Sequence, residues 1–292
     1  MEICEYLCGM MWYKILFTFL ISFVVQYLMI WACHRYGVFI DKVKKLPQKF
    51  HKISTPRCGG IGILIGSCTF LLFDKIGLFL ILASIPVLIV GILEDFTRKI
   101  LHYNLRLLLI STSSVLFILL FPEVLSRIHT PITNIPIIDS LPVGVISAIA
   151  ILFMIIAITG VTNAINIIDG FNGLASGTSL IAFMFLGFMA YIVGDIELLK
   201  IIVFLFTATL GFFLWNFPRA KIFLGDGGAY LLGFTLATIS LLLVCRNTAV
   251  SIWYPLIILG YPVWEVLFSI YRKALVRKKS PMQPDREFTY IC

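Results

Sequence analysis

Long apolar runs recur along this chain and leave little choice of fold. Each is close to the length of about 20 residues that an α-helix needs to cross a bilayer. They cover approximately residues 11–33, 58–73, 76–93, 105–122, 142–162, 178–194, 198–215, 228–245 and 249–271. A hydrophobic share of 60 % and a mean hydropathy of +1.01 exclude a water-soluble globule. We therefore predict an all-α, polytopic integral membrane protein with about nine transmembrane helices, organised as a single domain over residues 1–292.

Positive charge predicts the orientation of the chain. Most of the 23 Lys and Arg residues lie in the linkers after the first, third and seventh runs and in the tail after the ninth. Because cytoplasmic loops carry the excess of Lys and Arg, we expect the N-terminus outside and the C-terminus in the cytoplasm. The net charge of +8 is then a signal of orientation and lipid headgroups, and no nucleic-acid partner is expected. On the outer face, residues 123–141 alternate Ile with Thr and Pro, which predicts a small β-hairpin.

Four carboxylates gather at the predicted cytoplasmic surface. Glu94 and Asp95 end the third run, Asp169 follows the fifth run, and Asp226 opens the eighth. The topology came from Lys and Arg alone, so this clustering of acids is independent support for a site. In the Glu94–Asp95 pair one carboxylate could accept a proton while the other orients a partner. A solvated helix end with local ion pairs is about equally compatible with the same two residues.

Asp226 lies in a Gly-Asp-Gly-Gly turn directly before an apolar run. Backbone N–H groups at a helix start, here including that of Gly227, attract phosphate, and a carboxylate beside them suits Mg²⁺ that bridges to phosphate oxygens. Asn216, Arg219 and Lys221 just upstream favour this reading. An N-cap aspartate with glycines that bend the chain is the competing interpretation.

The linker around Asp169 is rich in amides and glycines. Asn163, Asn166 and Asp169 recur at intervals of three, which on a helical end-turn lines one face with oxygen and amide groups. Arg57, beside Gly59 and Gly60 at the start of the second run, again places a cation next to glycines, although an interfacial Arg with packing glycines explains it equally well. Mg²⁺ and phosphate at a membrane face indicate phosphoryl transfer that involves a lipid.

These motifs resemble the polyprenyl-phosphate N-acetylhexosamine-1-phosphate transferase family, also called glycosyltransferase family 4. The family contains the phospho-N-acetylmuramoyl-pentapeptide translocase and the initiating transferases of O-antigen and enterobacterial common antigen. The matching segments are residues 55–60 (TPRCGG), 91–96 (GILEDF), 163–177 (NAINIIDGFNGLASG) and 223–233 (FLGDGGAYLLG), in the order of the family.

The resemblance implies an enzyme of the bacterial inner membrane, with its site facing the cytoplasm. It would move a sugar 1-phosphate from a UDP-sugar to undecaprenyl phosphate, release UMP, depend on Mg²⁺ or Mn²⁺, and act in cell-wall or O-antigen (lipopolysaccharide) synthesis; a homodimer is compatible with it. By resemblance, Asp226 is the metal ligand and Asn166 its companion. The pair Glu94–Asp95 activates the lipid phosphate.

The remaining roles follow from the same resemblance. Asp169 and Asn172 contact the nucleotide and shape the site, and Asn216 lines it; we group Asp169 with Glu94 and Asp95 as candidate catalytic residues. Asn163, Asn172, Asn216, Gly227 and Arg57 are the candidates for nucleotide or phosphate binding.

Three positions depart from the family pattern. The acidic pair is Glu-Asp where better-known members have Asp-Asp, and Asn172 stands where Asp is frequent. The family's last loop continues from Pro-Asp-Arg into a His-rich motif and a further helix, whereas here residues 284–286 are followed by Glu-Phe-Thr-Tyr-Ile-Cys. We therefore expect that the last cytoplasmic loop and final helix are missing. The alternatives are an inactive truncated relic, or a lipid-linked-sugar transporter or binding protein on the same scaffold.

Overall fold

The computed structural model describes residues 12–41, 55–97, 102–124 and 143–272, which are almost entirely helical. The elements are α2 (Trp12–Tyr36), β1 (Ile40–Asp41), β2 (Thr55–Pro56), α3 (Gly59–Leu71), α4 (Lys75–Thr97), α5 (Tyr103–Leu120), α8 (Val143–Ile168), α9 (Leu174–Ile192), α10 (Ile196–Asn216), α11 (Gly225–Arg246), α12 (Trp253–Ile258) and α13 (Gly260–Tyr271). The two short strands pair antiparallel, with Ile40 opposite Pro56 and Asp41 opposite Thr55. The predicted all-α membrane fold is confirmed.

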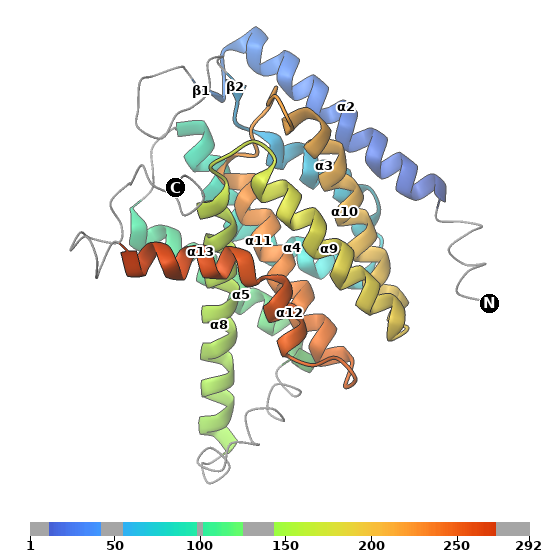
Figure 1. Ribbon diagram of the computed structural model, residues 1–292, viewed down its shortest axis with the longest axis vertical. Helices are drawn as coiled ribbons and strands as arrows, with labels where there is room; N and C mark the ends of the chain where they lie inside the picture. Colours follow the sequence, from blue (N-terminus) through green and yellow to red (C-terminus); the bar gives the residue numbers. More distant parts are fainter. Residues whose placement is uncertain (1–11, 42–54, 98–101, 125–142, 273–292) are drawn as a thin grey trace.

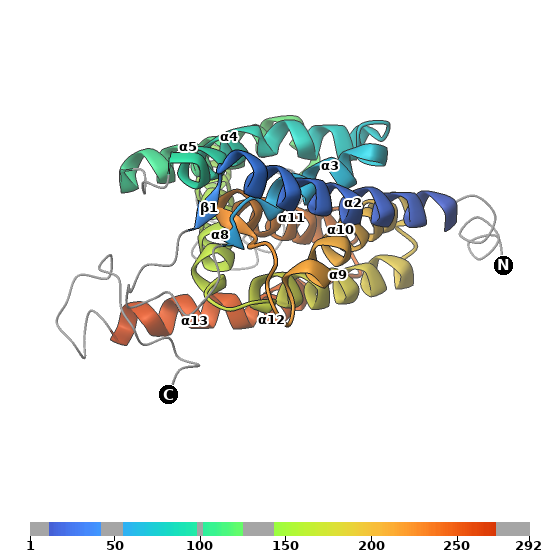
Figure 2. The same cartoon turned by 90° about the horizontal axis from the view of Figure 1, so that it is seen from above.

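Helix α11 is the centre of the bundle. Figure 2 shows it between a layer that contains α3, α4 and α5 and a layer that contains α9, α12 and α13. Of the apolar stretch of α11, 89 % is buried inside the protein, compared with 17 % for α2, which lies along the outside of the bundle. Helix α8 begins beyond the other helices and then packs on α11, and α13 crosses it (Figure 1). Whatever α11 carries at its first turn is therefore held by helices on several sides.

The helices agree with the predicted spans, with differences at their ends. Six described helices are long and apolar enough to cross a membrane: α2, α4, α8, α9, α10 and α11. Helix α3 and most of α5 are shorter apolar helices, and the predicted ninth span is divided into α12 and α13 at Leu259. The count of nine spans and the orientation stay predictions. Most of the predicted hairpin at 123–141 lies outside the described residues.

Side-chain hydrogen bonds explain where α4 begins and how it continues. Asp74 precedes the helix, and its Oδ1 accepts from the backbone N–H groups of Ile76 and Gly77 at 2.9 and 3.0 Å, which caps the free donors of the first turn. Inside the helix, Pro86 has no N–H to donate. The next N–H, that of Val87, donates to Ser113 Oγ of α5 at 3.0 Å, so α4 is bonded to its neighbour at this point.

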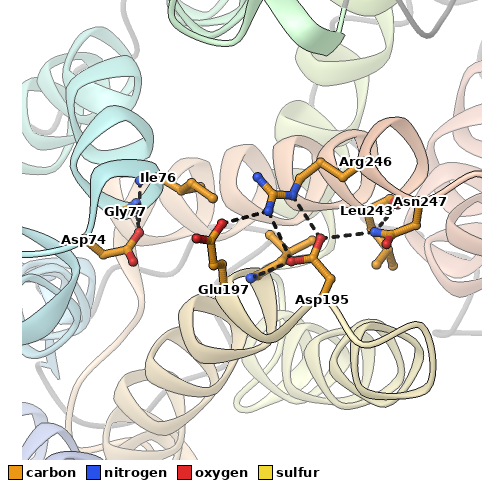
Figure 3. Close-up of polar contacts among 9 residues, drawn as sticks. Asp74, Ile76, Gly77, Asp195, Glu197, Leu243, Arg246 and Asn247 are labelled. Atoms are coloured by element: carbon orange, nitrogen blue, oxygen red, sulfur yellow. Dashed lines mark hydrogen bonds and ion pairs between the residues drawn. The ribbon is translucent and has the colours of Figure 1, made fainter.

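A polar cluster ties the C-terminal end of α11 to the start of α10. Arg246 donates to Asp195 Oδ2 and to Glu197 Oε2 at 2.9 and 2.8 Å, as Figure 3 shows. Asp195 also caps α10 by accepting from Leu198 N–H at 3.2 Å, and Asn247 donates to it at 3.1 Å. Because α11 has 22 residues and a helix rises about 1.5 Å per residue, this cluster lies at the opposite end of α11 from Asp226.

At the other end of α11, three backbones cross without room for side chains. A Cβ added to Gly60 of α3 would press on the backbone of Gly228, and one added to Gly91 of α4 would press on that of Gly227. Both contacts would be closer than real Cβ atoms allow. We call Gly60, Gly91, Gly227 and Gly228 the glycine crossing. It brings the end of α4 and the start of α3 against the first turn of α11.

Candidate active site

The segment before α3 runs beside the segment before α11 and thereby positions Arg57. Phe223 N–H donates to Pro56 O at 2.8 Å, and Gly59 N–H donates back to Phe223 O at 3.0 Å. Arg57 therefore stands beside the start of α11. Its Nη2 lies 3.4 Å from Asp226 Oδ2, and its Nε lies 3.8 Å from Asp95 Oδ1. One partly exposed guanidinium thus faces two of the predicted carboxylates.

Asp95 binds the first turn of α11. The backbone N–H groups of Asp226 and Gly227 donate to its two carboxylate oxygens, each at 2.9 Å. Unpaired N–H groups at a helix start favour an anion, and here that anion is a carboxylate of α4. Gly225 has φ +77°, a backbone conformation that glycine adopts without strain and that lets the chain turn there. It also leaves room for Asp95, because a Cβ on Gly225 would meet the Asp95 carboxylate. Gly227 N–H is occupied in this way, and its predicted role in phosphate binding stays a prediction.

Glu94 contacts α11 one turn after Asp226. It is 4 % exposed, and its Oε2 accepts a hydrogen bond of 3.1 Å from the hydroxyl of Tyr230, which is fully buried in α11. Adjacent residues on a helix point in different directions, so the two acids at the end of α4 contact α11 one turn apart. The sequence showed the acidic pair but gave no sign of its tyrosine partner.

Asp226 also contacts α8. That helix continues past the predicted end at residue 162 to Ile168 and so carries both asparagines of the central motif. Asn166 Nδ2 donates to Asp226 Oδ1 at 2.9 Å. Asn163, one turn earlier, donates instead to Thr159 O of its own helix at 2.9 Å. The predicted companion of Asp226 is therefore in contact with it, and Asn163 is bonded away from it.

Asp169 comes directly after α8 and completes the group of acids. Part of the residue remains accessible to solvent, yet protein surrounds its carboxyl group closely. Burial raises the pKa of this carboxyl to about 7; the Arg57 charge opposes the rise, and the Asp226 charge adds to it. Asp169 thus shares one electrostatic environment with Arg57 and Asp226.

The two remaining asparagines brace the loop that follows Asp169. Asn216 is buried; its Oδ1 accepts from Gly173 N–H at 2.6 Å and its Nδ2 donates to Ile222 O at 2.8 Å. Asn172 is exposed and donates to Pro218 O at 3.2 Å. These bonds join the loop between α8 and α9 to the segment that leads to Asp226. Their predicted contacts with a nucleotide stay predictions.

The space beside Asp95 is too small for a phosphate. A pocket of about 10 Å³ lies there, lined in part by Asp95, Gly60 and Gly227, and this volume suits about one water molecule. Asp226, by contrast, has 27 % of its side chain exposed. Asp226 is therefore accessible to a ligand, whereas the pocket beside Asp95 is not.

The donor set around Asp226 fits a metal that is completed by a ligand. The described residues contain no group of three or more His, Cys, Asp or Glu side chains able to hold a metal ion. Mg²⁺ is commonly held by one or two carboxylates together with substrate phosphates and water. Asp226 with the amide of Asn166 matches that pattern, because the side-chain oxygen of Asn166 would face the ion after a rotation of its amide.

A bundle of membrane-spanning helices with acids, an amide and an arginine gathered at helix ends defines a polytopic membrane protein with a polar site. Residues 77–244 match the model of a protein family described as glycosyl transferase family 4.

Curated relatives that are named as transferases match most of the chain. A probable undecaprenyl-phosphate N-acetylglucosaminyl 1-phosphate transferase of Bacillus subtilis is 29 % identical over 287 residues, which cover 94 % of this chain and 75 % of that protein. An undecaprenyl-phosphate alpha-N-acetylglucosaminyl 1-phosphate transferase of Thermotoga maritima is 32 % identical, over 87 % of this chain and 74 % of that protein. A phospho-N-acetylmuramoyl-pentapeptide-transferase of Staphylococcus carnosus is 29 % identical over 70 % of this chain and 67 % of that protein. The chain belongs to glycosyl transferase family 4 and is a membrane transferase, as the motifs predicted.

Proposed function

We propose that the chain transfers a sugar 1-phosphate of the N-acetylhexosamine type from a UDP-sugar to undecaprenyl phosphate and releases UMP. The names of the relatives support the lipid acceptor and the transferred group. The observation that carries the proposal is the contact of Asp226 with both Asn166 and Arg57 at helix ends. We place this site at the cytoplasmic face of a bacterial inner membrane, as the distribution of Lys and Arg predicts.

In the proposed reaction an oxygen of the lipid phosphate attacks the sugar-linked phosphorus of the UDP-sugar. A phosphorus–oxygen bond to the lipid forms, the bond to the UMP oxygen breaks, and UMP leaves with the bonding electron pair. Mg²⁺, or Mn²⁺, would neutralise the diphosphate and the charge that develops on UMP. Asp226 and Asn166 would hold the ion.

The chain's own residues supply position and charge. Arg57 faces Asp95 and Asp226 with a partly exposed guanidinium, so it can bind a diphosphate oxygen from the open side. Asn216 bonds the loop between α8 and α9 at Gly173, and Asp169 and Asn172 of that loop would contact the nucleotide.

The position of the acids separates this proposal from transport. Transporters hold their ionisable groups near the bilayer midplane on interrupted helices. Here Asp95 lies in the last turn of α4, Asp226 in the first turn of α11, and Asp169 just outside α8. These are helix ends, which suit chemistry at a membrane surface.

The test is release of UMP by the purified chain in detergent with UDP-GlcNAc, undecaprenyl phosphate and Mg²⁺, and with UDP-MurNAc-pentapeptide as a second donor. We expect UMP and a lipid diphosphate in equal amounts, both lost when EDTA replaces the metal. A hybrid chain that continues after residue 286 with the corresponding part of the Thermotoga maritima relative is measured in parallel. If neither chain forms UMP with either donor although both bind the nucleotide, the binding-protein alternative replaces the enzyme.

A further inference from the structure

Glu94 and Tyr230 form a contact that the proposed reaction does not use. The Tyr230 hydroxyl donates to Glu94 Oε2 at 3.1 Å, both residues are buried, and the contact joins α4 to α11. Tyr230 lies one turn after Asp226 on α11, so the two side chains are on the same side of the helix.

The environment of this contact suits a structural bond. Glu94 is 4 % exposed and Tyr230 is fully buried, so little water competes for the bond between them. A polar group buried among helices is tolerated when a hydrogen bond offsets its loss of water. The bond to Tyr230 therefore gives Glu94 a role at this position that is separate from proton transfer.

The acceptor chemistry also reduces the need for a base at this position. A phosphate monoester loses its second proton with a pKa of about 6, so it is mostly a dianion at neutral pH. Asp95 already accepts two N–H groups of the same helix end at 2.9 Å. Both acids at the end of α4 thus bind α11 at successive turns.

We infer that Glu94 is a positioning residue: through Tyr230 it fixes α11 against α4 and so sets the position of Asp226. This inference rests on the proposed function for the meaning of that position. It separates the roles of two acids that are adjacent in sequence. It also accounts for the longer Glu side chain, which reaches the tyrosine hydroxyl across the interface between the two helices.

Two substitutions of Glu94 distinguish positioning from base catalysis because the two roles rank them in opposite order. Glu94→Gln keeps the length and an acceptor oxygen for Tyr230 but removes the charge. Glu94→Asp keeps the charge but withdraws the carboxylate by about 1.5 Å, the length of one carbon–carbon bond. We expect Glu94→Gln to lower kcat by less than about tenfold and Glu94→Asp to lower it more, because only the latter breaks the bond.

Tyr230→Phe removes the same bond from the other side. We expect it to lower kcat about as much as Glu94→Asp, with the acid limb of the pH profile unchanged in every variant. The melting temperature in detergent should fall by about 2–5 °C in both. In the double variant Glu94→Asp/Tyr230→Phe the effects should not add. Tyr191→Phe, at an exposed position of α9, is the matched control and should leave the melting temperature within 1 °C, about the scatter expected of a surface change.

The inference is overturned if Glu94→Gln abolishes UMP release while Glu94→Asp retains it, or if the acid limb moves in Glu94→Gln. Additive losses of melting temperature in the double variant would also overturn it. The melting measurements need no substrate. If neither the wild-type chain nor the hybrid chain forms UMP although both bind the nucleotide, the proposed function fails, while the non-additivity of the Glu94 and Tyr230 variants still decides whether this bond holds α4 to α11.

Discussion

Asn166 and Asp226, 60 residues apart in sequence, meet through a hydrogen bond of 2.9 Å between the amide Nδ2 and the carboxylate Oδ1. The bond connects the end of α8 to the first turn of α11, and Arg57 lies against the other carboxylate oxygen at 3.4 Å. Asp226 is therefore held on both sides while part of its surface remains open.

Asn166→Ala should lower the rate of UMP release by about 10- to 100-fold, the usual effect of losing a group that orients or completes a metal site. The Mg²⁺ concentration for half-maximal rate should rise as well. Asp226→Asn should abolish the reaction. Asn163→Ala is the comparison, since Asn163 bonds within α8 at 2.9 Å. An equal loss in Asn163→Ala would show that the asparagines act through the stability of α8, and would contradict a specific role of Asn166.

Gly60→Ala and Gly91→Ala should each destabilise the protein by about 1–3 kcal/mol, as overpacking of a close contact does. The added methyl groups would meet the backbone of α11 at Gly228 and Gly227. Thermal unfolding in detergent measures the change. Gly160→Ala is the matched control, because a Cβ at Gly160 of α8 meets no atom within 4 Å, and the residue should gain helix propensity. A similar loss in all three variants would exclude the crossing as the cause.

Asp169→Asn should stabilise the metal-free protein more at pH 8 than at pH 5. Burial raises the pKa of Asp169 from the ordinary value of 3.8 to about 7. Between these values the folded chain binds more protons than the unfolded chain at this site, so its contribution to stability falls as pH rises through that window. At pH 8 the wild type holds a buried charge that the amide variant lacks. Melting temperatures of both proteins in EDTA at the two pH values test this, and a difference independent of pH contradicts it.

Arg246→Ala should destabilise the bundle by about 1–3 kcal/mol, because it leaves the buried Asp195 carboxylate without its opposite charge. Arg246 is partly exposed, and the value is therefore below that for a fully buried pair. Glu197→Ala removes the second, largely exposed partner of Arg246 (Figure 3) and should cost less than about 1 kcal/mol. Equal losses of melting temperature in the two variants would show that the burial of Asp195 does not matter.

Local patterns predicted the helices well because lipid imposes one length and one composition on every span. The ends were less predictable. Helix α8 continues through Asn163 and Asn166 because a polar side chain can bond to its own helix, as Asn163 does with Thr159 O. The division between α12 and α13 at Leu259 lies inside a continuous apolar run, where hydropathy changes little.

The site, too, was predictable only in part. The sequence indicates Asp226, Asn166 and Arg57 as site residues, and the structure brings them together. The partners that bind them depend on contacts far apart in the chain. In the sequence, Tyr230 is one aromatic residue in an apolar helix, and only the packing of α4 on α11 gives its hydroxyl the partner Glu94. The capping of α11 by Asp95 likewise requires α4 and α11 to cross at glycines. Contacts between residues so far apart in the chain cannot be predicted from local sequence patterns.

The glycine crossing also limits how this enzyme can diverge. Where α3 and α4 touch α11 main chain to main chain, a Cβ added at Gly60 or Gly91 would meet the backbone of Gly228, Gly227 or Asp226. Asn172 is exposed on the loop between α8 and α9, outside that contact, and can change without moving the helices. We therefore expect new donor preferences to arise by exchange of loop side chains, while the backbone geometry that presents Asp226 is kept.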